Sequence, residues 1–152
     1  MKKLLIIIIV LIVLFIGYSI TVIPSYNTLD ITHAIDEART TLKDNQEIVV
    51  FDSKNPFNFY DVFHRIDNIA GQKVYGILTK PDTVGIFPVI IGVAGSVGWG
   101  RHHYGYLERY VNMGFAVLSL HSFKSRSVES TVGEQLSVTV PMVVYEGVTV
   151  IE

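Results

Sequence analysis

The residues best able to do chemistry follow a short apolar run in the middle of the chain. Val89 to Val93 leads directly into a turn that holds Gly95, Gly98 and Gly100. Glycines let backbone N–H groups approach a ligand closely, and anions are commonly held where the end of a strand feeds the start of a helix. We therefore expect this turn to present backbone donors to a small ligand.

Phosphate cofactors do not fit the turn. A P-loop needs Lys followed by Ser or Thr after the glycines, and this turn has neither. A dinucleotide-binding fingerprint needs a different glycine spacing. It also needs an acidic residue at the end of the next strand, where this sequence has His121. The chain has 12 Lys and Arg against 14 Asp and Glu, a net charge of −2, which argues against a nucleic-acid partner. No cofactor is predicted.

Metal chemistry is not indicated either. His102 and His103 are adjacent, so on a helix their side chains point about 100° apart and cannot readily share a metal ion. His33 and His64 have acidic neighbours at helical spacing but no second histidine nearby. The sequence contains no cysteine, which removes thiolate ligands and cysteine nucleophiles from this stretch.

Three side chains could contact a substrate, and each has a structural alternative. Trp99 could line an acyl pocket or pack the loop. His102 could line the pocket beside the turn or be a polar residue at a helix start. Arg126 could hold a substrate carboxylate or be a solvated loop residue. The sequence leaves these alternatives open.

Four short apolar runs predict the strands that position these residues. We expect strands at 47–51, 73–79, 87–93 and 115–120, each bounded by turn-forming residues. The first two could pair across the polar and aromatic connection 52–71, whereas the last two are apolar enough to be buried central strands. A helix at 104–113, capped by Gly114, would lie between the last two strands and complete a right-handed βαβ unit.

The segments before and after these strands are less regular. Asp30 can begin a helix that runs to about Lys43 with an apolar stripe, as a stalk or packing helix. The tail 136–152 has two interpretations. Its valines favour a strand, but Pro141 could begin a short helix that buries Met142 and Tyr145.

The N-terminus carries an uncharged run at 4–23, interrupted only by Gly17, Ser19 and Thr21 and preceded by two lysines. As a helix it would reach about 30 Å and span a bilayer, with the lysines on the cytoplasmic side. Alternatively it is a signal peptide, cleaved at Gly17-Tyr18-Ser19, and a third interpretation is a buried core helix. Both of the first two interpretations export the rest of the chain, which would be membrane-anchored and periplasmic or extracellular, or secreted.

Short phrases on both sides of the turn carry a resemblance. Residues 73–81 read KVYGILTKP, a strand ending in a G-x-L-x-x-P phrase, and Pro88 then opens the strand that leads into the turn. A strand at 115–120 precedes the loop HSFKSRSV. Over 47–152 the chain resembles the N-terminal half of an α/β-hydrolase of the dienelactone hydrolase group. It departs from that pattern at Ala94, where the group usually has His, at His121 in place of Asp, and at Ser127 in place of Gly.

The resemblance implies an ester or lactone hydrolase whose oxyanion hole takes one backbone N–H from this turn and one from the residue after the nucleophile. Gly95, Ser96 and Val97 are the matching candidates. It also implies an incomplete α/β-hydrolase sheet of about four strands and one to two helices, and the apolar run at 4–23 adds a transmembrane or signal helix before it. The segments would be an anchor or signal at 1–23, a linker or stalk helix at 24–46, and the hydrolase half at 47–152.

The nucleophile is missing from this sequence. No G-x-S-x-G elbow occurs, and Ser96 lies in a G-S-x-G phrase one strand too early, so we expect it to act as a backbone donor. We therefore expect an N-terminal fragment of a hydrolase of small esters or lactones that does not turn over substrate alone. The alternatives are a non-enzymatic, membrane-anchored remnant and a small-ligand binding module.

Overall fold

The computed structural model describes residues 7–14 and 29–151. Residues 7–14 are helical, and no helix within the described ranges is long and apolar enough to cross a membrane. The rest of the apolar run expected at 4–23, and the start of the linker expected from residue 24, lie outside the described residues.

A mixed four-stranded sheet forms the centre of the molecule, and its strands are β1 (Gln46–Lys54), β2 (Gly71–Thr79), β3 (Val89–Val93) and β4 (Ala116–Leu120). Their spatial order is β1-β2-β4-β3. β2 is antiparallel to both β1 and β4, whereas β3 and β4 are parallel. The predicted α/β class, the four strands and the pairing of the first two are confirmed.

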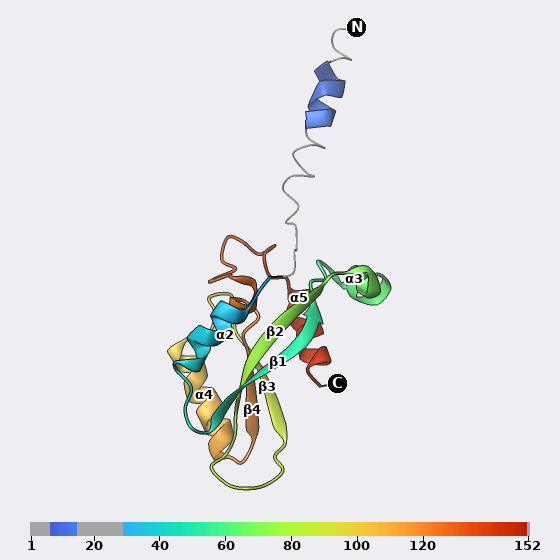
Figure 1. The fold of residues 1–152 in the computed structure, drawn as a ribbon. Helices are drawn as coiled ribbons and strands as arrows, with labels where there is room; N and C mark the ends of the chain where they lie inside the picture. The colour runs from blue at the N-terminus through green and yellow to red at the C-terminus, as the bar shows by residue number, and fades with distance from the viewer. Residues whose placement is uncertain (1–6, 15–28, 152) are drawn as a thin grey trace.

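Helices cover both faces of this sheet (Figure 1). Two helices, α2 (Thr32–Arg39) and α4 (Arg101–Asn112), lie on one side, and α5 (Val140–Thr149) lies on the other. The connection between β1 and β2, expected only as a polar and aromatic segment, holds α3 (Phe59–His64) and the short 3-10 turn η1 (Ile66–Asn68).

The βαβ unit expected around the turn is present as β3–α4–β4. Gly114 adopts φ +91°, and Phe115 N–H donates to the Tyr110 carbonyl at 3.1 Å, the pattern of a helix that ends at a left-handed glycine. α4 begins three residues earlier than expected. The His103 ring accepts the Gly100 N–H at 2.8 Å and so satisfies a donor that the helix start would otherwise leave free.

The expectation that β3 is a buried central strand is wrong. All five residues of β4 are buried, but Val89 and Val93 of β3 are 55% and 48% exposed. Within the described residues β3 pairs only with β4, so its other edge meets no strand. Apolar composition does not distinguish a central strand from an edge strand, because pairing is decided by segments distant in sequence.

The flanking helices also differ from expectation. α2 ends at Arg39 rather than near Lys43, because the Thr40 and Thr41 hydroxyls donate back to the carbonyls of Glu37 and Ala38 and compete with the helix. Its apolar stripe packs against Tyr75 of β2. In the tail the helical alternative is the one observed, since α5 begins with Pro141 in its first turn and buries Met142 completely.

Candidate functional site

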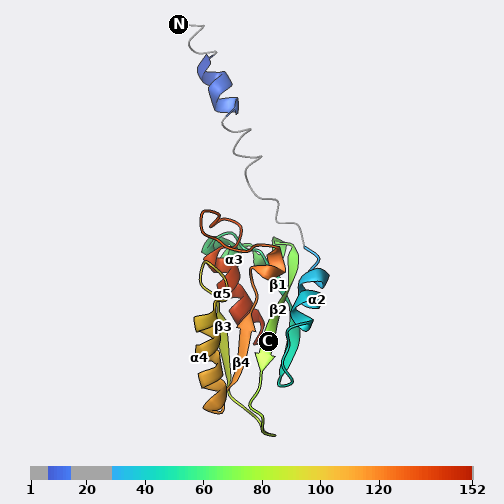
Figure 2. The same ribbon diagram turned by 90° about the vertical axis from the view of Figure 1, so that its left-hand side faces the viewer.

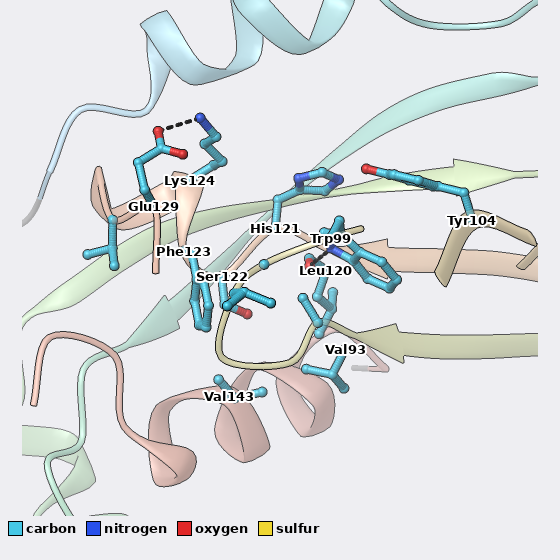
Figure 3. A pocket seen from close by; sticks show the side chains of 14 residues that line it. Val93, Trp99, Tyr104, Leu120, His121, Ser122, Phe123, Lys124, Glu129 and Val143 are labelled. Atoms are coloured by element: carbon cyan, nitrogen blue, oxygen red, sulfur yellow. Dashed lines mark hydrogen bonds and ion pairs between the residues drawn. The ribbon is translucent and has the colours of Figure 1, made fainter. Parts of the chain in front are cut away.

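The glycine turn lies beside a cavity at the carboxyl ends of β3 and β4 (Figure 3). Two parallel, adjacent strands end at the same edge of a sheet, so the loops that follow them meet there. The cavity has a volume of about 170 Å³. Its walls are mainly apolar and include Val93, Val97, Trp99, His121, Phe123 and Val143.

The turn itself runs from Gly95 to Gly98. Gly98 N–H donates to the Gly95 carbonyl at 2.8 Å, and Gly98 adopts φ +74°, a conformation that favours glycine. The Ser96 carbonyl accepts from the Thr131 N–H at 2.8 Å and from the Ser130 hydroxyl at 3.0 Å. These bonds hold the turn against the segment that follows η2 (Lys124–Arg126).

The hydrogen bonds accepted by the Gly95 and Ser96 carbonyls fix the directions of the Ser96 and Val97 N–H groups. A trans peptide points its C=O and its N–H in opposite directions. The Val97 N–H therefore points away from Thr131, and the Ser96 N–H points out of the turn. Among the described residues neither N–H has a hydrogen-bond acceptor. Val97 lines the cavity, whereas Gly95 and Ser96 lie outside its lining.

Trp99 lines the cavity and also packs the loop. Its indole Nε1 donates to the Leu120 carbonyl at 2.8 Å, which fixes the ring against the end of β4. The ring also lines the cavity and lies edge-on to His103, with ring centroids 5.6 Å apart. Trp99 therefore links the turn that follows β3 to the end of β4 and forms one side of the cavity.

His121 contributes the most altered titratable group of the site. Its ring stacks on Tyr75 with centroids 4.9 Å apart, and its buried Nε2 has no hydrogen-bond partner among the described residues. Burial, and secondarily the nearby Lys124 charge, lowers the pKa of His121 to about 4. The imidazole is therefore neutral at pH 7.

A charged pair lies at the cavity next to this neutral ring. Lys124 Nζ contacts a Glu129 carboxylate oxygen at 2.6 Å, and the hydrogen bond to Glu129 raises the pKa of Lys124. Tyr104 of α4 also lines the cavity, and burial raises the pKa of its hydroxyl. Figure 3 shows the Tyr104 hydroxyl directed toward the His121 ring. The site thus combines an apolar wall with a few polar groups.

Two of the predicted substrate contacts lie elsewhere. The His102 ring packs on His103, with ring centroids 3.8 Å apart at the start of α4, and does not line the cavity. Arg126 is not a solvated loop residue and does not line the cavity. Its guanidinium is buried, forms an ion pair with the buried Glu146 carboxylate of α5, and donates to Asn55 Oδ1 at 2.8 Å.

The described residues do not form a pair of a serine nucleophile and a histidine base. The Ser122 hydroxyl donates to Glu146 and the Ser119 hydroxyl to the Ile77 carbonyl, and within the described ranges no serine hydroxyl donates to a histidine. Over residues 7–14 and 29–151 no group of three or more His, Cys, Asp or Glu side chains could hold a metal ion.

Sequence reasoning missed part of this site. Tyr104, Lys124, Glu129 and Val143 were not singled out as site residues. His121 was noted as a departure from two motif patterns and not as part of the site. His121 could have been found, because it directly follows a strand parallel and adjacent to the one that feeds the turn. The contribution of Val143 depends on how α5 packs, which no local pattern gives.

Comparison with known proteins gives no family for this chain. No protein-family model matches it, and no curated protein is significantly similar to it. The dienelactone hydrolase assignment has no support from these comparisons and rests on the short phrases described above.

Proposed function

We propose that this chain is the N-terminal part of an exported α/β-hydrolase similar to dienelactone hydrolases, and that the Gly95–Gly98 turn supplies half of an oxyanion hole for small esters or lactones. In that fold one oxyanion donor comes from the loop between the third strand and the following helix. The observation that carries the proposal is the Val97 N–H, which has no acceptor among the described residues and belongs to a cavity-lining residue in that loop.

The cavity suits the carbonyl end of a small substrate. Its volume of about 170 Å³ and its apolar walls favour a short acyl group or a small lactone ring. A backbone N–H held by a rigid turn stabilises the negative charge that develops on a carbonyl oxygen during attack. In this proposal the nucleophile, its acid and its histidine come from residues that this sequence does not contain.

Membrane attachment is the second part of the proposal. Residues 4–23 would hold the domain at the membrane with the soluble part outside the cytoplasm, because the two preceding lysines favour the cytoplasmic side. A cleaved signal peptide is the alternative, and it leads to the same side of the membrane.

The hydrolase proposal is tested by removing one backbone donor. In the product of the complete reading frame, the Val97 N–H is replaced by an ester oxygen through incorporation of the α-hydroxy analogue of valine. We expect kcat for p-nitrophenyl acetate to fall about 10²–10³-fold, the usual effect of losing one oxyanion donor. The same replacement at Ser96, which does not line the cavity, is the matched control. Equal rates for the Val97 variant and the unmodified enzyme would contradict the role of Val97.

A binding module is the second candidate, because the cavity is present without a nucleophile in the described residues. This candidate predicts saturable binding of acetate or inorganic phosphate by the chain, measured from the amide shifts of the turn. A bulky substitution at Gly95 abolishes that binding if the turn holds the anion. A true stop codon after Glu152 would favour this candidate over the hydrolase.

A further inference from the structure

An exposed aromatic surface lies on α3. Phe59, Tyr60 and Phe63 are 47%, 54% and 75% exposed on a helix of only six residues. Aromatic side chains are costly to leave in water in such a cluster, and a contiguous exposed apolar surface marks an interaction site. We name these three side chains the α3 aromatic surface.

The surface is held rigidly. Asn58 Oδ1 accepts the Asp61 N–H at 2.9 Å, and the Asp61 carboxylate accepts the Phe57 N–H at 3.1 Å, which together fix the start of α3. The Thr139 hydroxyl donates to the carbonyl of the buried Pro56 at 3.0 Å, and Lys54 Nζ donates to the Ile66 carbonyl at 2.7 Å. Both segments that flank α3 are therefore tied to the domain.

Leu29, the first described residue after the apolar run at 4–23, lies at the same end of the domain as α3. The side-chain amide of Gln72 accepts the Leu29 N–H at 3.1 Å and donates to the Leu29 carbonyl at 3.3 Å. Gln72 pairs in register with Ser53, and the next residue of β1, Lys54, leads to α3. Figures 1 and 2 both show α3 and the start of α2 at the same end of the sheet.

Chain length limits how far that end can lie from a membrane. Five residues lie between Ile23 and Leu29, and the six Cα–Cα steps from Ile23 to Leu29 reach about 20 Å when the chain is fully extended. If 4–23 spans the bilayer, this end of the domain faces the lipid and the opposite end, with the β2–β3 loop, does not.

The chemistry of the surface suits a bilayer interface. Tyr60 and Phe residues are the types that lie at the boundary of headgroups and acyl chains. The Arg65 guanidinium lies over the Tyr60 ring, 4.9 Å from its centroid, and its side chain is 62% exposed, so it adds a cation that lipid phosphates attract. The nearest carboxylate, Asp61, is mostly covered and lies 3.8 Å from Arg65. Asp67 of η1 is also exposed.

We propose that the α3 aromatic surface docks into the headgroup and acyl boundary of the membrane that holds the N-terminal segment, and so fixes the orientation of the domain. This inference rests on the membrane attachment proposed above. It is independent of hydrolytic activity.

Spin labels test the docking directly, because the chain has no cysteine of its own. A nitroxide is attached in the full chain at Phe63→Cys, Val84→Cys or Val13→Cys, and each protein is reconstituted in phosphatidylcholine vesicles. Val84 is the matched control, since it is a fully exposed apolar residue in the β2–β3 loop. The measurement is the ratio of collision rates with oxygen, which concentrates in lipid, and with a water-soluble nickel complex.

We expect the label at 63 to show a several-fold higher ratio than the label at 84, and the label at 13 to show the highest. Equal ratios at 63 and 84, with a high ratio at 13, would overturn the docking and leave the membrane attachment standing. Water-like ratios at all three positions would overturn the attachment and the docking together.

Discussion

His121 is the side chain whose chemistry its surroundings change most. Burial lowers its pKa from about 6.5 to about 4, so the unfolded chain binds a proton below pH 6.5 that the folded chain does not accept until about pH 4. Protons therefore favour the unfolded state, and the free energy of unfolding falls as the pH drops through this window. The size of the loss is about 2–3 kcal/mol.

The substitution His121→Phe removes this dependence and keeps a flat ring on Tyr75. Between pH 7 and pH 4 the free energy of unfolding falls for both proteins. We expect the decrease to be about 2 kcal/mol smaller for the variant than for the unmodified chain. Urea unfolding followed by Trp99 fluorescence measures both proteins at each pH. Parallel pH profiles for the two proteins would contradict the lowered pKa, because they would show that His121 has the same pKa in the folded and unfolded states.

Arg126 shows where residue-level prediction stops. Its neighbours in sequence are polar, and this indicated a solvated or ligand-binding arginine. The structure instead pairs it with Glu146, twenty residues away on a helix that the sequence left ambiguous. A buried ion pair needs both partners, and nothing in the local pattern of either one reveals the other. Trp99 was more predictable, because the turn and the strand that it joins are adjacent in the predicted βαβ unit.

At the scale of elements, the turn between β3 and α4 depends on one glycine more than on the others. Gly98 adopts φ +74°, where a Cβ is strained, whereas a Cβ on Gly95 would meet no atom within 4 Å. We expect Gly98→Ala to lower the free energy of unfolding by about 1–2 kcal/mol and Gly95→Ala to change it by less than about 1 kcal/mol. Thermal unfolding of the two variants makes the comparison, and equal losses would contradict the geometry of the turn.

Elements with their own sequence signals were predicted well. The four strands and α4 have short apolar runs, turn residues and a glycine cap, and all five are observed. α3 was missed because it is short and its aromatic residues are exposed, so it has no apolar stripe. The tail was ambiguous because valines favour strands by propensity, whereas packing against β1 makes the segment a helix.

At the scale of the whole molecule, the described residues leave part of the sheet uncovered. β3 has one edge without a partner among them, and an open groove lies on the sheet face between α4 and the segment that joins α2 to β1. Ile77 and Ser119 form part of the floor of this groove. A hydrolase domain that continues beyond this sequence would cover both regions with further strands and helices.

The most direct test of the hydrolase proposal is to sequence the encoding DNA through and beyond the codon for Glu152. The account predicts an open frame that encodes a strand, a G-x-S/C-x-G elbow, and then an acidic residue and a histidine in that order. A stop codon directly after Glu152 would contradict the hydrolase proposal and leave a protein with a cavity but no nucleophile.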